Sequence, residues 1–568
     1  MSTSSSVESP TPRPWLSSYA EGVPSDIELP TGSLVDLIAD SVARFGRSVA
    51  LEFFGQETTY RELGEQIERA AEGLRTLGVK HGDRVALVLP NCPAHVVAFY
   101  AVLRLGAIVV EHNPLYTPRE LRHQFEDHGA TVAIAWNKVC ETIQNMPDDL
   151  GITQLVSVDI VRGMPLSTRI ALRLPVKKAR ESRTALYAKV RHTTTWESLL
   201  QNRRIAASVP GPSVDDVALL QYTSGTTGTP KGAILTHLNL HVNALQGRAW
   251  VPGLNDGDEV FYGVLPLFHA YGLTLCLTFA MSIGARLVLL PRFDVDLVLK
   301  AAKKHPPTFL PAVPPIYQRL AQAATERGID LTSIRYAISG AMPLPVPTVE
   351  LWENLTGGRL VEGYGLTETS PVALANPVGP TRRAGSIGLP FPNTEIRVVD
   401  PDDVATDRAF GEAGELLIRG PQVFQGYWRK PDQTKDVLLK DGWFRTGDIV
   451  SLSEDGYVSV VDRIKELIIT GGFNVAPSEV EDALRMHPTV DDVAVIGLPG
   501  PRGDEEVVAA VVLKSGEQLD ETAIRDFCRE HLTAYKVPRR VVEIDELPVS
   551  LIGKVLRRQV RENLLKSD

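Results

Sequence analysis

The chain has few cysteines and no apolar run long enough to span a membrane, and both shortages narrow what it can be. Only four cysteines occur in its 568 residues, at Cys92, Cys140, Cys276 and Cys528. None is part of a C-x-x-C pair, so a disulfide framework or a zinc site is disfavoured, and a reducing, cytoplasmic environment is indicated. The uncharged apolar stretch 270–285 is shorter than the roughly 20 residues of a membrane-spanning helix. We expect it to form a buried helix that leads into a strand.

Basic residues are outnumbered by acidic ones. The chain has 59 Lys and Arg against 69 Asp and Glu, a formal net charge of -10, which argues against nucleic acid as a general partner. Segment 162–191 is the exception, because it holds nine basic residues and one acid, Glu181, among interleaved Leu, Ile and Val. Two interpretations stay open: a peripheral contact with the anionic headgroups of a membrane, or a solvated insertion that packs on the surface.

A chain of this length predicts more than one domain. Residues 1–30 open with MSTSSSVESPTPRPW, which has no apolar signal core, and are predicted to be a disordered tail. Helical and strand-like patterns alternate over 33–136 and again over 215–365, which predicts parallel strands covered by helices. From about residue 383 short strands predict a smaller β-rich part, and from about residue 465 a compact α/β unit follows.

The run YTSGTTGTPKG at 222–232 is the most informative motif. Its glycines let backbone amides approach an anion, its hydroxyl groups add donors, and Lys231 adds a positive charge, so the run suits a polyphosphate. It is not the Walker pattern G-x-x-x-x-G-K-[ST], because Lys231 precedes Gly232. The preceding DDVALLQ predicts a strand, and α/β proteins bind ligands at the carboxyl ends of strands. A flexible surface linker is the alternative.

Further runs follow in a fixed order along the chain. They are LPLFHAYG at 265–272, SGAMPL at 339–344, EGYGLTET at 362–369, GWFRTGD at 442–448, VDRIKELIITGGFNVAP at 461–477 and LPVSLIGKVLRR at 547–558. Together with the first run they resemble the adenylate-forming superfamily of acyl-CoA synthetases, 4-coumarate-CoA ligases, luciferases and adenylation domains. Within it, NPLYTPREL at 113–121 is most similar to bacterial long- and medium-chain fatty-acid-CoA ligases.

The resemblance implies an α/β fold and a two-step reaction. A large N-terminal domain of two α/β sheets plus a β-barrel subdomain is expected at 31–464, and a small mobile α+β C-terminal domain at 465–568. ATP, with Mg²⁺, and a medium- or long-chain fatty acid would form an acyl-adenylate and pyrophosphate, and coenzyme A would then form the thioester and release AMP. The substrate carboxylate is the nucleophile, in keeping with a sequence that lacks a G-x-S-x-G elbow.

The resemblance assigns one group of residues to the nucleotide. The β- and γ-phosphates would be held by Thr223, Ser224, Gly225, Thr226, Thr227 and Lys231. Glu368, with Thr223, would bind Mg²⁺, which prefers hard oxygen ligands; an ordinary acid at a helix N-terminus is the alternative for Glu368. Tyr364 would stack on adenine, with Gly340, Ala341, Glu362, Gly363 and Thr367 around it; a plain core tyrosine is the alternative.

A second group would act on the ribose, the reacting atoms and coenzyme A. Asp448 would accept from the ribose hydroxyls, and Arg463 would reach the ribose or the phosphate. Lys554 would bridge the acyl carboxylate and the α-phosphate. Its neighbour Val549 departs from the Lys or Arg of many relatives. Lys465 would be the hinge, Gly471 and Gly472 would line the pantetheine tunnel, and His269 would contact the acyl group, although a lone histidine is more often structural.

Several functions stay open at this stage. A fatty-acyl-AMP ligase that delivers to a carrier protein and an aryl-acid CoA ligase use the same motifs. A luciferase-like oxygenase shares the adenylation step, and a non-catalytic nucleotide-binding module is a further alternative. The sequence does not indicate the acyl chain length or the oligomeric state.

Overall fold

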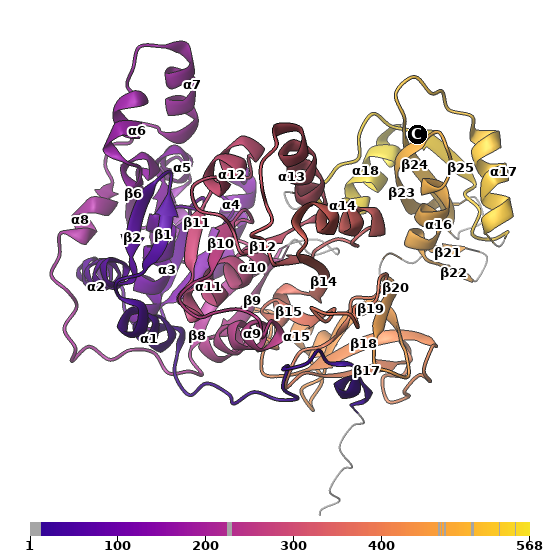
Figure 1. The fold of residues 1–568 in the computed structure, drawn as a ribbon, viewed down its shortest axis with the longest axis horizontal. Coiled ribbons are helices and arrows are strands. Elements are labelled where there is room, and N and C mark those ends of the chain that lie inside the picture. The colour runs from indigo at the N-terminus through magenta and orange to yellow at the C-terminus, as the bar shows by residue number, and fades with distance from the viewer. Residues whose placement is uncertain are drawn as a thin grey trace, which may run out of the picture. The chain divides into compact units, whose positions relative to one another are not determined.

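The computed structural model describes residues 13–223, 230–463, 466, 468–470, 473–500, 505–532, 534–550 and 553–567. Its internal contacts divide the chain into two compact units. The larger unit comprises Ser18–Glu395 and Arg419–Gly442, and the smaller unit comprises Met1–Ser17, Ile396–Ile418 and Trp443–Asp568. Figure 1 shows the helices and strands of both.

A seven-stranded sheet of the larger unit holds the predicted polyphosphate motif. Its strand order is β7-β6-β5-β3-β4-β8-β9, and every neighbouring pair is parallel except β8 and β9. The strands are β3 (Arg84–Val88), β4 (Ile108–Glu111), β5 (Val132–Trp136), β6 (Gln154–Val158), β7 (Thr194–Thr195), β8 (Val217–Thr223) and β9 (Lys231–Thr236). The parallel arrangement predicted from the alternating patterns is confirmed.

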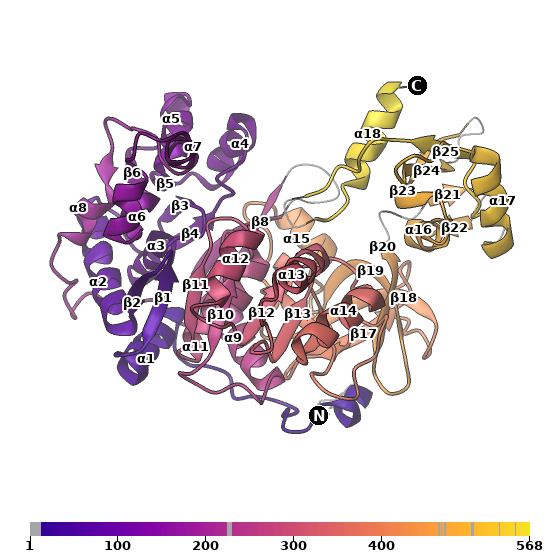
Figure 2. The ribbon, with the colours of Figure 1, turned by 45° about the horizontal axis from the view of Figure 1, so that its top comes forward.

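A nine-stranded sheet forms the rest of the larger unit, in the order β16-β15-β14-β13-β12-β10-β11-β1-β2. The pairs from β14 to β1 are parallel, so their carboxyl ends lie along one edge. Figure 2 shows β10 to β13 side by side with α12 and α13 in front of them. The strands are β1 (Val49–Phe53), β2 (Gln56–Thr59), β10 (Val260–Gly263), β11 (Arg286–Leu289), β12 (Phe309–Ala312), β13 (Tyr336–Ser339), β14 (Arg359–Gly365), β15 (Val372–Ala375) and β16 (Leu389–Pro390).

Helices cover these sheets, and local sequence sets their starts. Thr117 caps α4 and Glu120 returns the bond in a capping box, while Pro118 at the first helical position fits a helix start. The NPLYTPREL run is thus a turn followed by a helix start. The larger unit's main helices are α1 (Leu34–Phe45), α2 (Tyr60–Thr76), α3 (Pro93–Arg104), α4 (Pro118–His128), α5 (Asn137–Gln144), α6 (Leu166–Ala171), α7 (Lys177–Leu186), α8 (Trp196–Leu200), α9 (His237–Trp250), α12 (Val295–Ala302), α13 (Pro314–Arg327), α14 (Val346–Thr356) and α15 (Pro431–Val437).

The apolar stretch 270–285 is a buried helix, as predicted. It comprises α10 (Ala270–Gly272), a π-helical turn (Leu273–Thr278) and α11 (Phe279–Ser282), and it leads into β11. Across the described ranges, no helix is both long and apolar enough to cross a membrane.

The smaller unit contains three sheets. Where the resemblance implied a β-barrel, the strands form a four-stranded sheet in the order β17-β18-β19-β20. A two-stranded sheet pairs β21 with β22, and a three-stranded sheet has the order β23-β24-β25. The bounds are β17 (Glu395–Val399), β18 (Ala413–Arg419), β19 (Phe444–Leu452), β20 (Val458–Arg463), β21 (Ile468–Thr470), β22 (Phe473–Val475), β23 (Val490–Pro499), β24 (Glu505–Leu513), β25 (Arg540–Glu543), α16 (Pro477–Arg485), α17 (Glu521–His531) and α18 (Arg557–Ser567).

The N-terminal segment differs from the predicted disordered tail over 1–30. Residues 1–12 lie outside the described part, but Pro14–Ser18 form a short 3-10 helix in which Trp15 is 1% exposed. Tyr19 donates a hydrogen bond to the carbonyl of Pro390 (2.6 Å) and packs edge-on against Trp250. Buried aromatic side chains therefore fix residues 13–19, a constraint that composition alone does not reveal.

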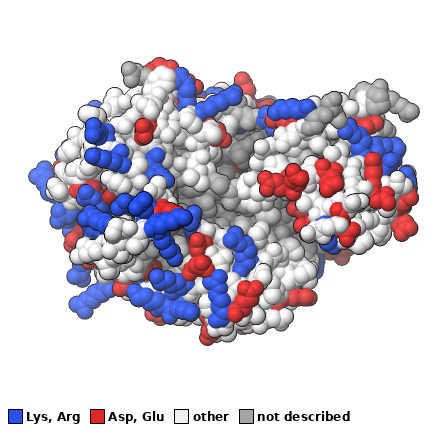
Figure 3. All heavy atoms as spheres, turned by 90° about the horizontal axis from the view of Figure 1, so that it is seen from above, with Lys and Arg blue, Asp and Glu red and all other residues white. Residues whose placement is uncertain are grey.

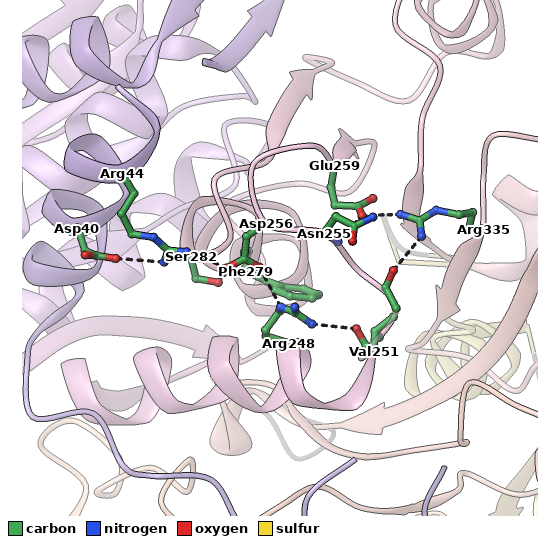
Figure 4. Close-up of polar contacts among 11 residues, drawn as sticks. Asp40, Arg44, Arg248, Val251, Asn255, Asp256, Glu259, Phe279, Ser282 and Arg335 are labelled. Carbon is green, nitrogen blue, oxygen red and sulfur yellow. Dashed lines mark hydrogen bonds and ion pairs between the residues drawn. The ribbon is translucent and has the colours of Figure 1, made fainter. Parts of the chain in front are cut away.

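A buried carboxylate fixes the amino edge of the nine-stranded sheet. Glu259, 1% exposed, accepts hydrogen bonds from the guanidinium of Arg335, the hydroxyl of Thr308 and the amide of Asn255. These residues lie just before or at the starts of β10, β12 and β13, so one carboxylate ties three strands together. Figure 4 shows Glu259 beside Arg335 and Asn255, and the exposed pairs from Arg248 and Arg44 nearby. Such exposed pairs contribute little to stability, whereas the buried carboxylate depends on its partners.

Candidate functional site

The two ends of the polyphosphate motif lie on paired antiparallel strands. Thr223 ends β8 and Lys231 begins β9, and the two residues are register partners across the antiparallel pair. Because β8 runs parallel to β4, Thr223 lies at the carboxyl end of a strand of the parallel sheet. The register thus brings Thr223 and Lys231 opposite each other on adjacent strands. Ser224, Gly225, Thr226 and Thr227 lie outside the described residues.

Tyr427 joins Lys231 to Glu368. The ammonium nitrogen of Lys231 lies 4.9 Å from the centroid of the Tyr427 ring, a cation–π contact. The hydroxyl of Tyr427 donates to Oε1 of Glu368 at 2.6 Å. Burial raises the pKa of Tyr427 well above its ordinary range, so the hydroxyl stays protonated and remains a donor. The predicted phosphate cation and the predicted metal ligand therefore share one aromatic side chain.

The backbone around Tyr427 is held against β9. The amides of Gln425 and Trp428 donate to the carbonyls of Ile234 (3.0 Å) and Gly232 (2.8 Å), and Tyr427 forms an isolated antiparallel bridge with Ala233 of β9. Tyr427 is 9% exposed and cannot move without breaking this pairing. Sequence reasoning missed this residue, because it lies far from both partners in the chain and its neighbours carry no distinctive charge pattern.

Glu368 lies on a tight turn at the end of β14. Residues Thr367–Thr369 form a 3-10 turn, and the amide of Leu366 donates to the hydroxyl of Thr369 at 3.0 Å. Glu368 is 8% exposed, and its own carbonyl accepts from the amide of Phe424 at 2.8 Å. The carboxylate is thus fixed from both the turn and the segment that carries Tyr427.

The residues predicted to surround adenine come from β13 and β14, which are adjacent. Ser339 pairs with Glu362 in register, so Gly340 and Ala341 follow one strand beside Glu362, Gly363 and Tyr364 of the other. A Cβ on Gly340 would lie 3.0 Å from the ring of Tyr271, and Ala341 adopts a left-handed conformation (φ 66°). The turn therefore leaves little room for a side chain at Gly340.

Burial raises the pKa of Glu362 to about 8, because desolvation disfavours its charged form. The carboxyl group is consequently neutral at pH 7. A folded pKa above the unfolded value contributes stability that is fully present below about pH 4.5 and is lost as the pH rises through 8.

We expect Glu362→Gln to remove this pH dependence, since the amide is neutral at every pH in the range. Each unit of pKa shift corresponds to about 1.4 kcal/mol, so the melting temperature of the variant relative to the parent should rise by several degrees between pH 5 and pH 8.5. Thermal unfolding followed by circular dichroism measures the difference. Glu65→Gln, which removes an exposed carboxyl group, is the control. A difference that does not change with pH would contradict the neutral state of Glu362.

His269 is neutral at pH 7, because burial lowers its pKa to about 4. Its Nδ1 accepts from the amide of Tyr271 at 3.2 Å, and Tyr271 in turn donates to the carbonyl of Ile338 at 2.7 Å. His269 thus follows β10 and is linked to β13 at the carboxyl edge of the nine-stranded sheet. It is placed to act as a neutral contact and not as a cation.

The smaller unit carries the other predicted residues. Asp448 in β19 is 2% exposed and is the register partner of Arg463 in β20, so the two predicted ribose contacts are neighbours on one sheet. Lys554 lies on a tight turn: its carbonyl accepts from the amide of Ser550 at 2.7 Å and its amide donates to the Ser550 hydroxyl at 3.1 Å. Lys465, Gly471 and Gly472 lie outside the described residues.

The residues present fit a magnesium-bound nucleotide. In the described residues no group of three or more His, Cys, Asp or Glu is arranged to hold a metal alone. Glu368 and Thr223 offer hard oxygen donors, and Mg²⁺ commonly completes its shell with substrate phosphates and water. The buried hydroxyl of Ser339, beside Gly340, has no hydrogen-bond partner among the described residues, so it has unused capacity for a polar ligand.

Comparison with known proteins identifies the family. The sequence pattern of the AMP-binding enzyme family matches residues 38–428, and that of its C-terminal domain matches residues 479–554. The chain belongs to the AMP-binding enzyme family. It is 37% identical to a long-chain-fatty-acid–CoA ligase of Bacillus subtilis over 97% of this chain and 98% of that protein. A Salmonella typhimurium protein of the same name is 39% identical over 96% of this chain and 98% of its own length.

A solved structure of an AMP-binding family member has the same fold. The crystal structure of ATP-bound MatB from Rhodopseudomonas palustris matches with a TM-score of 0.81 and 30% identity, over 93% of this chain and 98% of that one. The resemblance to the adenylate-forming superfamily and the predicted mixed α/β fold, with a large N-terminal part and a small C-terminal domain, are both confirmed.

We expect Tyr427→Phe to weaken the binding of MgATP while leaving the fold intact. The ring under Lys231 is kept, but Glu368 loses a hydrogen bond to a charged group, worth about tenfold in affinity. Two readouts test this: the KM for MgATP, and the rise in melting temperature with added MgATP. Tyr262→Phe, which removes a hydroxyl that donates to the His305 carbonyl, is the control. If the KM for MgATP and the rise in melting temperature were the same in Tyr427→Phe as in the parent, the hydroxyl of Tyr427 would have no role in binding MgATP.

Proposed function

We propose that this AMP-binding enzyme is a fatty-acid-CoA ligase that uses ATP and Mg²⁺ to activate medium- or long-chain fatty acids. The observation that carries the proposal is the connected set Thr223, Lys231, Tyr427 and Glu368, in which a cation and a hard carboxylate contact one tyrosine and Thr223 is the register partner of the lysine. The two bacterial relatives named as long-chain-fatty-acid–CoA ligases support the acid class and the thiol acceptor.

The chemistry follows from charge. ATP and a carboxylate repel each other, so fixed cations must neutralise both before the carboxylate oxygen attacks the α-phosphorus. The bond to the β-phosphate oxygen breaks as the new P–O bond forms, and pyrophosphate leaves. The thiol of coenzyme A then attacks the acyl carbonyl, loses its proton, and expels AMP. Mg²⁺, when bound, neutralises phosphate charge; no protein nucleophile is needed.

The remaining site assignments form part of this proposal. Lys231 and residues 223–227 hold the departing phosphates. Tyr364 with Gly340, Ala341, Glu362, Gly363 and Thr367 holds adenine, and Asp448 with Arg463 holds the ribose. Lys554 neutralises the reacting carboxylate and α-phosphate, and His269 contacts the acyl group near it. In this proposal, separate groups of residues hold the phosphates, the adenine and the ribose of one nucleotide.

The C-terminal part is proposed to move between the two half-reactions. The boundary lies at Lys465, with 31–464 as the adenylate-forming domain and 465–568 as the mobile domain. Gly471 and Gly472, which have no side chains, would let pantetheine pass in the second state. The matches of separate family patterns to residues 38–428 and 479–554 support two domains on either side of such a hinge.

A panel of acids tests the function. Short, medium and long aliphatic acids and aryl acids are compared for ATP–pyrophosphate exchange and for CoA-dependent AMP release. We expect the largest kcat/KM for medium or long aliphatic acids, with AMP release that requires coenzyme A. Preference for aryl acids would favour a 4-coumarate-like ligase. Exchange without CoA-dependent turnover would favour an acyl-AMP ligase that delivers to a carrier protein. No exchange with any acid would overturn the adenylating function.

We further propose that the enzyme is a cytoplasmic protein that associates peripherally with anionic membranes through segment 162–191. The excess of basic residues in this segment, on a chain whose formal net charge is -10, supports an electrostatic contact with lipid headgroups.

A further inference from the structure

The helices of segment 162–191 form a projecting hairpin that buries none of its helical side chains. α6 and α7 include no buried residue, whereas every other described helix of eight or more residues in the larger unit has buried residues. Figure 1 shows the two helices rising from the sheets as a pair, with their connection at the far end. The hairpin therefore contributes little to the hydrophobic core, and packing does not explain its apolar residues.

Large apolar side chains are concentrated on this hairpin and face solvent. Leu166 is 65% exposed, Ile170 56%, Leu174 51% and Val176 53%, and Tyr187 follows at 38%. These five are a third of the fifteen large hydrophobic side chains that are exposed in the described residues, although they span only residues 166–187. Leu166 and Ile170 are four residues apart on α6, so they share one face. Such a concentration marks an interaction surface.

Basic side chains flank the apolar ones. Exposed Lys and Arg follow in and beside α7, at Arg173, Lys177, Lys178, Arg180 and Arg183. Figure 3 views the molecule from the side of the hairpin and shows blue residues gathered on the left part of the surface, among white ones. The one acid, Glu181, lies 3.9 Å from Lys177 and is too weak a partner to neutralise the cluster. The surface thus pairs apolar area with positive charge.

The hairpin is attached firmly at its base. The indole of Trp136 donates to the carbonyl of Leu186 at 3.0 Å, and the ammonium of Lys138 donates to the carbonyl of Thr184 at 2.9 Å. At the other end Met164 is 2% exposed. Bonds to the last carbonyls of α7 fix the helix on β5 and α5, so the surface is presented in one orientation.

We propose that the α6–α7 hairpin inserts its apolar side chains into the acyl region of an anionic phospholipid bilayer while its basic side chains bind the headgroups. This deepens the proposed peripheral contact, and its link to substrate supply rests on the proposed fatty-acid-CoA ligase function. A basic segment without the apolar residues would be released by salt. The hairpin combines two attractions, which stable peripheral binding requires, and holds the enzyme where membrane-dissolved fatty acids are found.

Vesicle flotation with the full-length protein tests the insertion. Phosphatidylcholine vesicles with and without phosphatidylglycerol are used at low and high salt. We expect the parent to bind the anionic vesicles, and to keep part of this binding at high salt. The Leu166→Ser, Ile170→Ser, Leu174→Ser and Val176→Ser quadruple variant should be released by salt. The Lys177→Glu, Lys178→Glu and Arg180→Glu triple variant should lose about 100-fold or more in affinity, since one basic residue near an anionic surface is worth about fivefold.

Two double variants with substitutions of the same kind elsewhere in the larger unit are the controls. Val346→Ser with Leu351→Ser removes exposed apolar side chains from α14, and Lys300→Glu with Lys303→Glu reverses exposed charges near α12; both should bind like the parent. A Leu174→Trp reporter should be quenched by lipids brominated in their acyl chains, and Val346→Trp should not. Parent protein that stays unbound, or a quadruple variant with the parent's salt response, would overturn the insertion.

Activity separates this inference from the proposed function. With a short, water-soluble acid the hairpin variants should retain the parent's rate, because no hairpin residue has been placed in the site. With long-chain acid supplied in anionic vesicles they should show a higher apparent KM. Vesicle binding without any adenylation would contradict the ligase function but not the insertion. Adenylation without vesicle binding would contradict the insertion but not the ligase function.

Discussion

Lys554→Ala should lower the rate of adenylation by about 100- to 1,000-fold, which is the usual cost of removing one group that stabilises developing charge in a transition state. The reason is electrostatic. The carboxylate and the α-phosphate approach each other as anions, and Lys554 is the proposed cation between them. Formation of the thioester from supplied acyl-AMP should be retained, because in that step the acyl group is no longer an anion and the proposed rotation takes Lys554 away.

The two half-reactions are measured separately. ATP–pyrophosphate exchange reports adenylation, and CoA-dependent AMP release from supplied acyl-AMP reports thioester formation. Lys566→Ala, an exposed lysine on α18 of the same unit, is the matched control and should affect neither. If Lys554→Ala reduced both half-reactions equally, the residue would be structural or would act after adenylation.

Gly365→Ala should unfold the larger unit or reduce its stability by about 3–5 kcal/mol, which is among the largest effects expected for a single methyl group. A Cβ at this position would lie 1.8 Å from the carbonyl oxygen of Pro371. That oxygen belongs to the backbone and also accepts from the amide of Leu366, so it cannot move aside without breaking the turn that carries Glu368. The added methyl group therefore forces the backbone at Pro371 to move.

Chemical unfolding and the yield of soluble protein measure this effect. Gly211→Ala is the control, since no atom lies within 4 Å of the added Cβ and its φ is not in the left-handed region. We expect the control to equal the parent in stability. A Gly365→Ala protein with the parent's stability and MgATP response would show that the turn at 365–371 adapts, and would weaken its role in fixing Glu368.

The parts of the fold that follow local rules were predictable. The strand-like patterns predicted within 33–136 correspond to β3, β4 and β5, and the predicted strand DDVALLQ corresponds to most of β8. Their apolar runs are typical of parallel strands buried on both faces. The strand before the motif at 222–232 was also predicted, and the motif itself stays a prediction over residues that lie outside the described part.

The parts that depend on distant contacts were not predictable. Tyr427 contacts Lys231 and Glu368 from a segment that no pattern distinguishes, and pairing with β9 puts it there. Trp15 is buried although its neighbours look like a disordered tail. The basic segment showed its charge in sequence, but only the folded hairpin shows that its apolar residues are exposed rather than packed. In each case the position of the side chain depends on residues that are distant in the sequence.

The buried Glu259 has a consequence for how such an enzyme can evolve. It ties β10, β12 and β13 at their amino ends, whereas Gly340, Glu362 and His269 lie at the opposite edge of the same sheet. Mutations that destabilise one edge need not destabilise the other when their contacts are separate. Duplicated genes could therefore diverge at the carboxyl edge toward new acids, while purifying selection on the amino edge preserved a foldable sheet.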